Sequence, residues 1–115
     1  MLKVFRNYRD EHNLPKEIYD DYALLRFLRA RKFVWDDTKI MFENYMTWRT
    51  EQKVDTIIED FEFKEDELVQ KYYPHKYHKI DKHGRPIYIE RQGQINVNEL
   101  FAITNDDNLM KHYIQ

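Results

Sequence analysis

Residues 22–33 read Tyr-Ala-Leu-Leu-Arg-Phe-Leu-Arg-Ala-Arg-Lys-Phe, and the rest of the chain is interpreted around this stretch. At 100° per residue, four apolar side chains fall on one side of a helix: Leu24, Leu25, Phe27 and Leu28. Arg26 and Arg29 fall on the opposite side, which is typical of an amphipathic helix. Asp20 is a suitable N-cap, so we expect this helix to begin directly after it.

Two further cations, Arg31 and Lys32, end this stretch and return to the angular range of the apolar residues. We expect them in the last helical turn, where cations match the negative end of the helix dipole. A cation at the edge of an apolar layer otherwise needs a carbonyl, a carboxylate or a bound anion as its partner. The residues alone favour a solvated, dipole-matched pair, and a binding site for the phosphate head of a lipid stays open as the alternative.

Composition excludes several classes of function. With 115 residues and a net charge of −2, the chain has no overall field that would attract nucleic acid, so any anion site must be local. It contains no Cys and no Ser, which excludes disulfides, thiolate metal sites, and Cys or Ser nucleophiles. The five histidines show no metal-ligand spacing. We therefore predict no metal site, no catalytic residue and no enzymatic activity.

The first half of the chain is predicted to be helical. We expect a helix over Leu2–His12, ended by Pro15, and a long helix from the N-cap Asp36 to about Lys53. Four residues are predicted to form the apolar stripe of the long helix: Ile40, Met41, Tyr45 and Trp48. Phe42 and Met46 are expected to widen this stripe enough to contact two neighbouring elements. A short helix near Tyr72 should follow an acidic band between residues 59 and 67, which most resembles a solvated surface.

After Pro74 the spacing of apolar residues changes from about 3.6 toward 2. Tyr77–Ile80 and Ile87–Arg91 are predicted to be strands. The residues between them include Asp-Lys-His-Gly, which is typical of a type I turn whose left-handed last position is Gly84. This part of the chain therefore predicts a β-hairpin.

Two more helices are expected, over Val97–Ile103 and from about Asp107, with Thr104 or Asn105 as the cap of the second. Two paired strands alone are marginally stable and leave unpaired edges. We therefore expect a mostly α chain that ends in the opening part of an α/β domain.

The sequence resembles the CRAL-TRIO lipid-transfer family, in particular the yeast-type secretory phosphatidylinositol/phosphatidylcholine transfer proteins. Leu24–Phe33 matches the family's N-terminal signature, and matching blocks follow in order along the chain. They are Met41–Asn44, Trp48-Arg49, Val54–Ile57, Lys71–Pro74, Tyr77–Lys79, Asp81-Lys82 and Gly84–Tyr88.

The resemblance implies an architecture and a function. Residues 1–74 would form the helical CRAL-TRIO N-terminal domain, and residues 75–115 the beginning of a truncated α/β lipid-binding domain. A complete form would bind phosphatidylinositol or phosphatidylcholine as a ligand, need no other cofactor, and move the lipid between membranes without catalysis. Arg31 and Lys32 match family positions at the lipid headgroup, and their chemistry suits a phosphate.

Two questions of context stay open at this point. The resemblance implies a cytoplasmic protein that contacts membrane surfaces transiently, although an organellar location is also compatible with the sequence. The alternative is a truncated family member that serves as a structural or adaptor subunit, with a protein partner covering its incomplete sheet. No nucleic-acid partner is expected, because no recognised motif is present.

Overall fold

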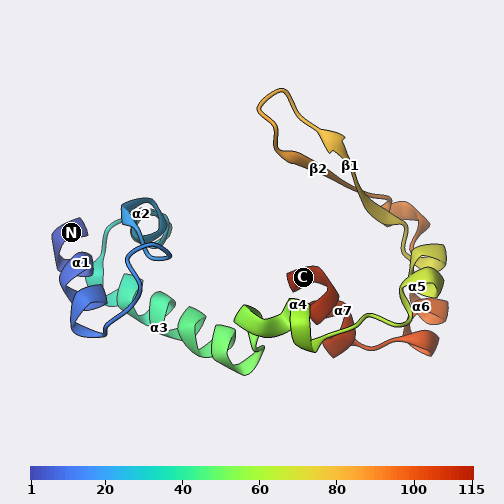
Figure 1. The fold of residues 1–115 in the computed structure, drawn as a ribbon, viewed down its shortest axis with the longest axis horizontal. Helices are drawn as coiled ribbons and strands as arrows, with labels where there is room; N and C mark the ends of the chain where they lie inside the picture. Colours follow the sequence, from blue (N-terminus) through green and yellow to red (C-terminus); the bar gives the residue numbers. More distant parts are fainter. The chain divides into compact units, whose positions relative to one another are not determined.

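The computed structural model describes residues 1–115 and divides them into two compact units, Met1–Lys53 and Val54–Gln115 (Figure 1). The first unit contains three helices: α1 (Leu2–Glu11), α2 (Asp21–Ala30) and α3 (Trp35–Glu51). The second contains the 3-10 turns η1 (Val54–Thr56) and η2 (Gln92–Gln94), the helices α4 (Ile57–Asp60), α5 (Asp66–Tyr72), α6 (Val97–Ile103) and α7 (Asp106–Ile114), and the strands β1 (His75–Ile80) and β2 (Pro86–Glu90).

This content confirms the expected fold class, which is mostly helical with the start of a sheet. The predicted domain boundary after residue 74 concerns a larger fold and stays a prediction. None of the helices combines the length and the apolar character that crossing a bilayer requires.

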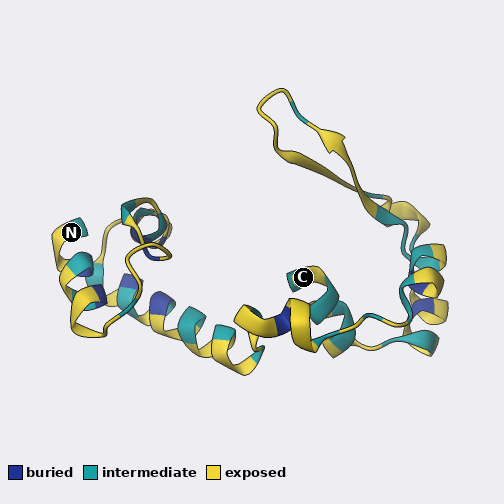
Figure 2. Ribbon diagram, viewed as in Figure 1, coloured by how far each residue is buried: buried dark blue, intermediate teal, exposed yellow.

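Aromatic rings form the core of the first unit. The side chains of Phe5, Leu24, Leu28 and Phe42 are almost completely buried, and Figure 2 shows the buried positions on the facing sides of α1, α2 and α3. The ring of Phe42 lies edge-on to Phe5 at 5.0 Å and to Phe27 at 5.1 Å between centroids. Such edge-to-face pairs add to the free energy gained from burial, so Phe42 holds the three helices together.

Polar contacts fix how these helices meet. Arg6 of α1 forms an ion pair with Asp21 in the first turn of α2. The Tyr8 hydroxyl donates to Glu43 of α3 at 2.9 Å. Arg9 is buried, and its guanidinium donates to the Tyr19 carbonyl at 3.0 Å, so the buried charge is hydrogen-bonded rather than isolated.

One prediction about α3 is wrong and another is correct only in part. Its N-cap is Val34 instead of Asp36, because Trp35 is already helical and Asp36 lies in the first turn, beside the positive end of the dipole. The predicted apolar stripe is correct in part: Phe42 is buried and Met41, Tyr45 and Met46 pack against the core, whereas Ile40 is 58% exposed and Trp48 37% exposed. Apolar residues lie on several sides of this helix, and the rings of α1 and α2 select the Phe42 side.

The predicted hairpin is confirmed. β1 and β2 pair antiparallel, with Tyr77 opposite Tyr88, and a bulge follows Tyr77 where Lys79 has a φ of 59°. At the turn, the Gly84 amide donates to the Asp81 carbonyl at 3.0 Å, and Gly84 has a φ of 79°. The Asp81 carboxylate also accepts from backbone amides of the turn, which explains why Asp is favoured there.

Asparagine side chains cap the N-termini of the last two helices, α6 and α7. α6 has the predicted bounds, and its N-cap is Asn96, whose side chain accepts from the Glu99 amide. Asn105, one of the two expected candidates, caps α7 by accepting from the Asn108 amide at 2.8 Å. Glu65 accepts from Thr104 and Asn108 at 2.9 Å each, and so connects the residues before α5 to α7.

Candidate functional site

Arg31 and Lys32 lie after α2 and not in its last turn, so that part of the prediction is wrong. The helix ends at Ala30, Arg31 is the C-cap residue, and Lys32 and Phe33 have φ values of 52° and 60°. Because the backbone leaves the helix here, the helical angular range used to place both cations does not apply to them.

A Schellman motif produces this ending. The Phe33 amide donates to the Leu28 carbonyl at 2.8 Å, and the Lys32 amide donates to the Arg29 carbonyl at 3.3 Å. These are the two hydrogen bonds that satisfy the last carbonyls of a helix when the following residue is left-handed. Glycine usually occupies that position, and here it is Lys32. The motif therefore fixes the backbone that carries both cations.

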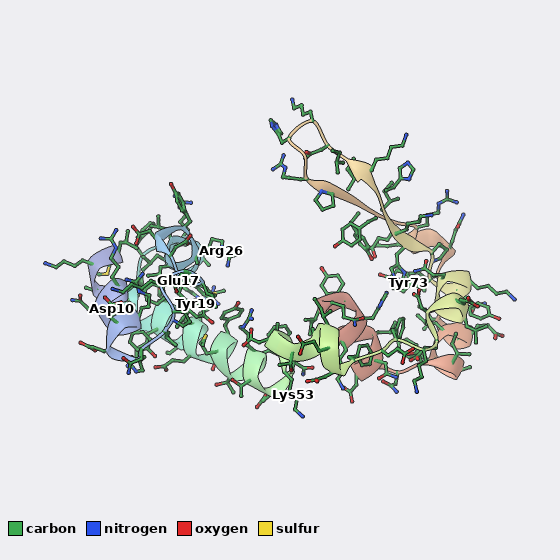
Figure 3. The ribbon with its side chains drawn as sticks, in the orientation of Figure 1. Asp10, Glu17, Tyr19, Arg26, Lys53 and Tyr73 are labelled. Atoms are coloured by element: carbon green, nitrogen blue, oxygen red, sulfur yellow. The ribbon has the colours of Figure 1, made fainter.

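Neither cation has an acidic partner. Both side chains are exposed, and the only hydrogen bond of the Arg31 guanidinium is to the carbonyl of its neighbour Ala30, at 3.1 Å. Arg26, on the exposed side of α2 and labelled in Figure 3, and Arg29 likewise form no ion pair. The end of α2 therefore presents two uncompensated positive charges that an anion can reach.

The second unit contains a pocket of about 910 Å³ that sequence reasoning missed. Its lining combines aromatic and apolar side chains with two histidines: Tyr73, His75, Tyr88, Leu109, Met110, His112 and Tyr113 are among them. Pockets of this size and composition are typical of small-molecule sites. Strand β1 and helix α7 bring the lining together from positions far apart in the chain, and no local sequence signal marks it.

Titratable groups along this pocket have shifted pKa values. The hydrogen bond that Tyr73 donates to Glu90, together with burial, raises the pKa of the Tyr73 phenol. The same hydrogen bond lowers the pKa of Glu90. Burial and the neighbouring His75 lower the pKa of His112. The polar side of the pocket is therefore a network with a neutral imidazole at His112 near neutral pH.

One group in this pocket has the donor atoms that a metal ion requires. A carboxylate oxygen of Asp66 and ring nitrogens of His75 and His112 all lie within 4.8 Å of one another. The sequence led us to expect no metal site, because no two of these residues have a recognised metal-ligand spacing. Only the fold brings the three together.

Comparisons with known proteins agree with this architecture. The CRAL/TRIO N-terminal domain family matches residues 2–44. The SEC14 cytosolic factor of Kluyveromyces lactis is 49% identical over 113 residues, which cover 98% of this chain and 37% of the relative. The phosphatidylinositol/phosphatidylcholine transfer protein SFH9 of Arabidopsis thaliana is 44% identical over 115 residues, covering 99% of this chain and 20% of the relative.

The chain thus spans little more than a third of the length of the first of these relatives and a fifth of the second. The similarity nevertheless extends over nearly all of this chain, from the three-helix unit through the hairpin to α7. It confirms the resemblance carried by Leu24–Phe33 and the blocks after it. Residues 2–44 match the CRAL/TRIO N-terminal domain family and nearly the whole chain is similar to SEC14-type relatives, which together support a SEC14-type CRAL-TRIO protein.

Proposed function

We propose that this chain is the N-terminal part of a phospholipid-binding protein that carries phosphatidylinositol or phosphatidylcholine between membranes. Relatives that are 44–49% identical are named for this transfer or as SEC14 cytosolic factors. The protein acts by binding and releasing a lipid, without making or breaking a bond, and needs no cofactor beyond the lipid itself. It works in the cytoplasm and contacts membrane surfaces transiently.

Arg31 and Lys32 contact the phosphate of the inositol lipid in this proposal. The supporting observation is that both cations are exposed, lack acidic partners, and are carried by a hydrogen-bonded helix end. A guanidinium can hold a phosphate through two parallel hydrogen bonds, and an ammonium adds a compact charge. Because neither cation is paired with a carboxylate, a phosphate can bind both of them without displacing an existing partner.

A chimera tests this assignment. The chain would replace the matching segment of the Kluyveromyces lactis SEC14 cytosolic factor, which supplies a complete lipid domain. Transfer of labelled lipid would be measured between vesicles of phosphatidylcholine with and without phosphatidylinositol. We expect the double variant Arg31→Ala/Lys32→Ala to weaken phosphatidylinositol binding about 100-fold or more, because two charge-assisted hydrogen bonds are lost and each is worth roughly 1.5–3 kcal/mol.

The matched control removes the same amount of positive charge, but from within α2 rather than from the residues after it. Arg26→Ala/Arg29→Ala deletes two exposed cations that lie within α2, and it keeps the backbone carbonyl of Arg29 that the C-terminal motif uses. We expect this control to retain selective phosphatidylinositol binding and to lower only the general, salt-dependent attraction to anionic vesicles. Equal losses in both double variants would reduce the role of Arg31 and Lys32 to non-specific electrostatics, and no loss in either would refute the headgroup site.

A second candidate function is that of an adaptor subunit with a protein partner on the hairpin. It is favoured by the exposure of apolar hairpin residues, since Tyr77 is 67% and Ile80 64% exposed. A partner chain covering them would remove that surface from water. Size-exclusion chromatography with lipid mass spectrometry on the 115-residue chain separates the candidates, because a lipid-loaded monomer excludes the adaptor and a chain that is soluble only with a partner supports it.

A further inference from the structure

Three side chains from three elements of the second unit converge at one end of its pocket. Asp66 begins α5, His75 begins β1, and His112 lies in the last turn of α7. The Nε2 atoms of His75 and His112 are 2.9 Å apart, and a carboxylate oxygen of Asp66 lies 3.9 Å from the Nε2 of His112. All three side chains are partly buried and line the pocket.

The surroundings orient the His75 ring for coordination. Its Nδ1 lies 2.7 Å from the Tyr73 carbonyl, an acceptor that requires the proton on Nδ1 in the neutral ring. The lone pair of Nε2 then faces the Nε2 of His112, 2.9 Å away. A histidine whose second nitrogen donates to a carbonyl is the arrangement that proteins use to fix the tautomer of a metal ligand.

His112 is held from its other side. Its ring stacks on Phe63 with centroids 4.2 Å apart and an angle of 23° between the planes. Gln70 lies between Asp66 and His75. Its amide nitrogen is 3.4 Å from a carboxylate oxygen of Asp66 and 3.4 Å from the Nε2 of His75. The three donor atoms are thus positioned by separate contacts, in addition to those they make with one another.

We infer that Asp66, His75 and His112 form a binding site for a divalent transition-metal ion, most suitably Zn²⁺. Two imidazole nitrogens and one carboxylate oxygen are a recognised zinc ligand set, with the fourth position left to water or a ligand. At Zn–N distances of about 2.0–2.1 Å, two nitrogens of a tetrahedral site lie about 3.3 Å apart. The observed 2.9 Å therefore needs an outward adjustment of only a few tenths of an ångström.

A hydrogen bond between the two rings is the alternative explanation of the 2.9 Å distance. With the His75 proton on Nδ1, His112 must donate from its Nε2, and Asp66 at 3.9 Å then has no part in the contact. A metal ion replaces the one shared proton and uses all three groups. It would also crosslink α5, β1 and α7, adding to the hydrogen bonds that Gln70 and Glu65 make there.

Titration of the chelator-treated, 115-residue chain with Zn²⁺ tests the proposal. Isothermal calorimetry should show one ion bound per chain, and Co²⁺ should give the intense visible absorption of a tetrahedral nitrogen and oxygen site. His75→Gln and His112→Gln should each weaken Zn²⁺ binding by at least about 10-fold. Removing a residue that only supports a metal ligand already lowers the affinity for the metal by about that factor. His78→Gln and His83→Gln are matched controls, because both residues are exposed on the hairpin outside the cluster.

NMR of the wild-type chain provides a readout that does not depend on how the variants fold. On addition of Zn²⁺, the Nε2 signals of His75 and His112 should shift together and saturate at one equivalent, while those of His12, His78 and His83 stay unchanged. Binding that the His75→Gln and His112→Gln variants retain would overturn the proposal. So would the absence of binding at millimolar Zn²⁺, and the ring contact would then be a hydrogen bond alone.

Discussion

Lys32 is the residue at which the sequence and the structure give opposite expectations for a substitution to glycine. In the last turn of a helix, as the sequence predicted, glycine would destabilise the fold. In the structure Lys32 follows the helix with a φ of 52°, in the left-handed region that glycine adopts most easily. We therefore predict that Lys32→Gly is more stable than Lys32→Ala.

The magnitude follows from three contributions, one of which is the same in both variants. Both variants lose the charge near the helix end, which is worth about 0.3–1 kcal/mol if the dipole interaction is present. Only alanine keeps the side-chain clash of a left-handed residue, about 1–2 kcal/mol, while glycine adds about 0.5–1 kcal/mol of chain entropy. The difference between the variants should thus be about 0.5–1 kcal/mol in favour of glycine.

Urea denaturation followed by circular dichroism measures this difference, with the wild-type chain as the reference. Arg26 provides the matched control because it is exposed in the middle of the same helix. There the order should reverse, with Arg26→Gly less stable than Arg26→Ala by about 1 kcal/mol. Opposite signs at the two positions are the expected result.

The same two Lys32 variants also separate binding from folding. In the chimera used to test lipid transfer, both should weaken phosphatidylinositol binding although they differ in stability. If Lys32→Gly were the less stable of the pair, Lys32 would not occupy a left-handed position and our account of the helix end would be wrong. If stability behaved as expected and binding did not change, the helix end would stand and the headgroup role of Lys32 would be refuted.

Two further predictions concern the first unit. Phe42→Ala should lower the free energy of unfolding by about 3–5 kcal/mol in urea denaturation, because its ring is buried among other rings, whereas exposed Ile40→Ala should cost about 0.5 kcal/mol. Burial and the hydrogen bond to Glu43 raise the pKa of Tyr8 to about 12. The folded chain keeps this proton while the unfolded chain loses it, so stability should fall between about pH 10 and 12, and by less in Tyr8→Phe; an identical fall in that variant would contradict this assignment.

The elements that the sequence predicted correctly are those decided by local chemistry. The hairpin follows from Asp81 and Gly84, whose turn hydrogen bonds need no distant partner. The start of α2 follows from Asp20, whose carboxylate accepts from the Ala23 amide at 2.9 Å. Side chains that bond to nearby backbone groups leave a signal in the sequence, and a reader can find it without knowing the fold.

Only part of the buried face of α3 could be found in this way. Ile40, Met41 and Phe42 are consecutive apolar residues, so periodicity allows more than one stripe. The choice depends on Phe5 and Phe27, which belong to other helices and approach Phe42 edge-on. The pocket and the His75–His112 pair are further cases, because residues 37 positions apart meet only in the folded chain.

Arg31 and Lys32 show how a useful prediction can rest on a mistaken geometry. The helical wheel returned both cations to the edge of the apolar layer, where each needs either solvent and the helix dipole, which the residues alone favoured, or a partner. The structure instead places them beyond the helix, exposed and without a carboxylate. A buried pair would bind phosphate only after losing an existing partner, whereas an exposed pair on a fixed backbone has little desolvation to repay and no bond to exchange. An anion therefore binds at this helix end at a lower cost in desolvation than it would if the two cations already had a partner.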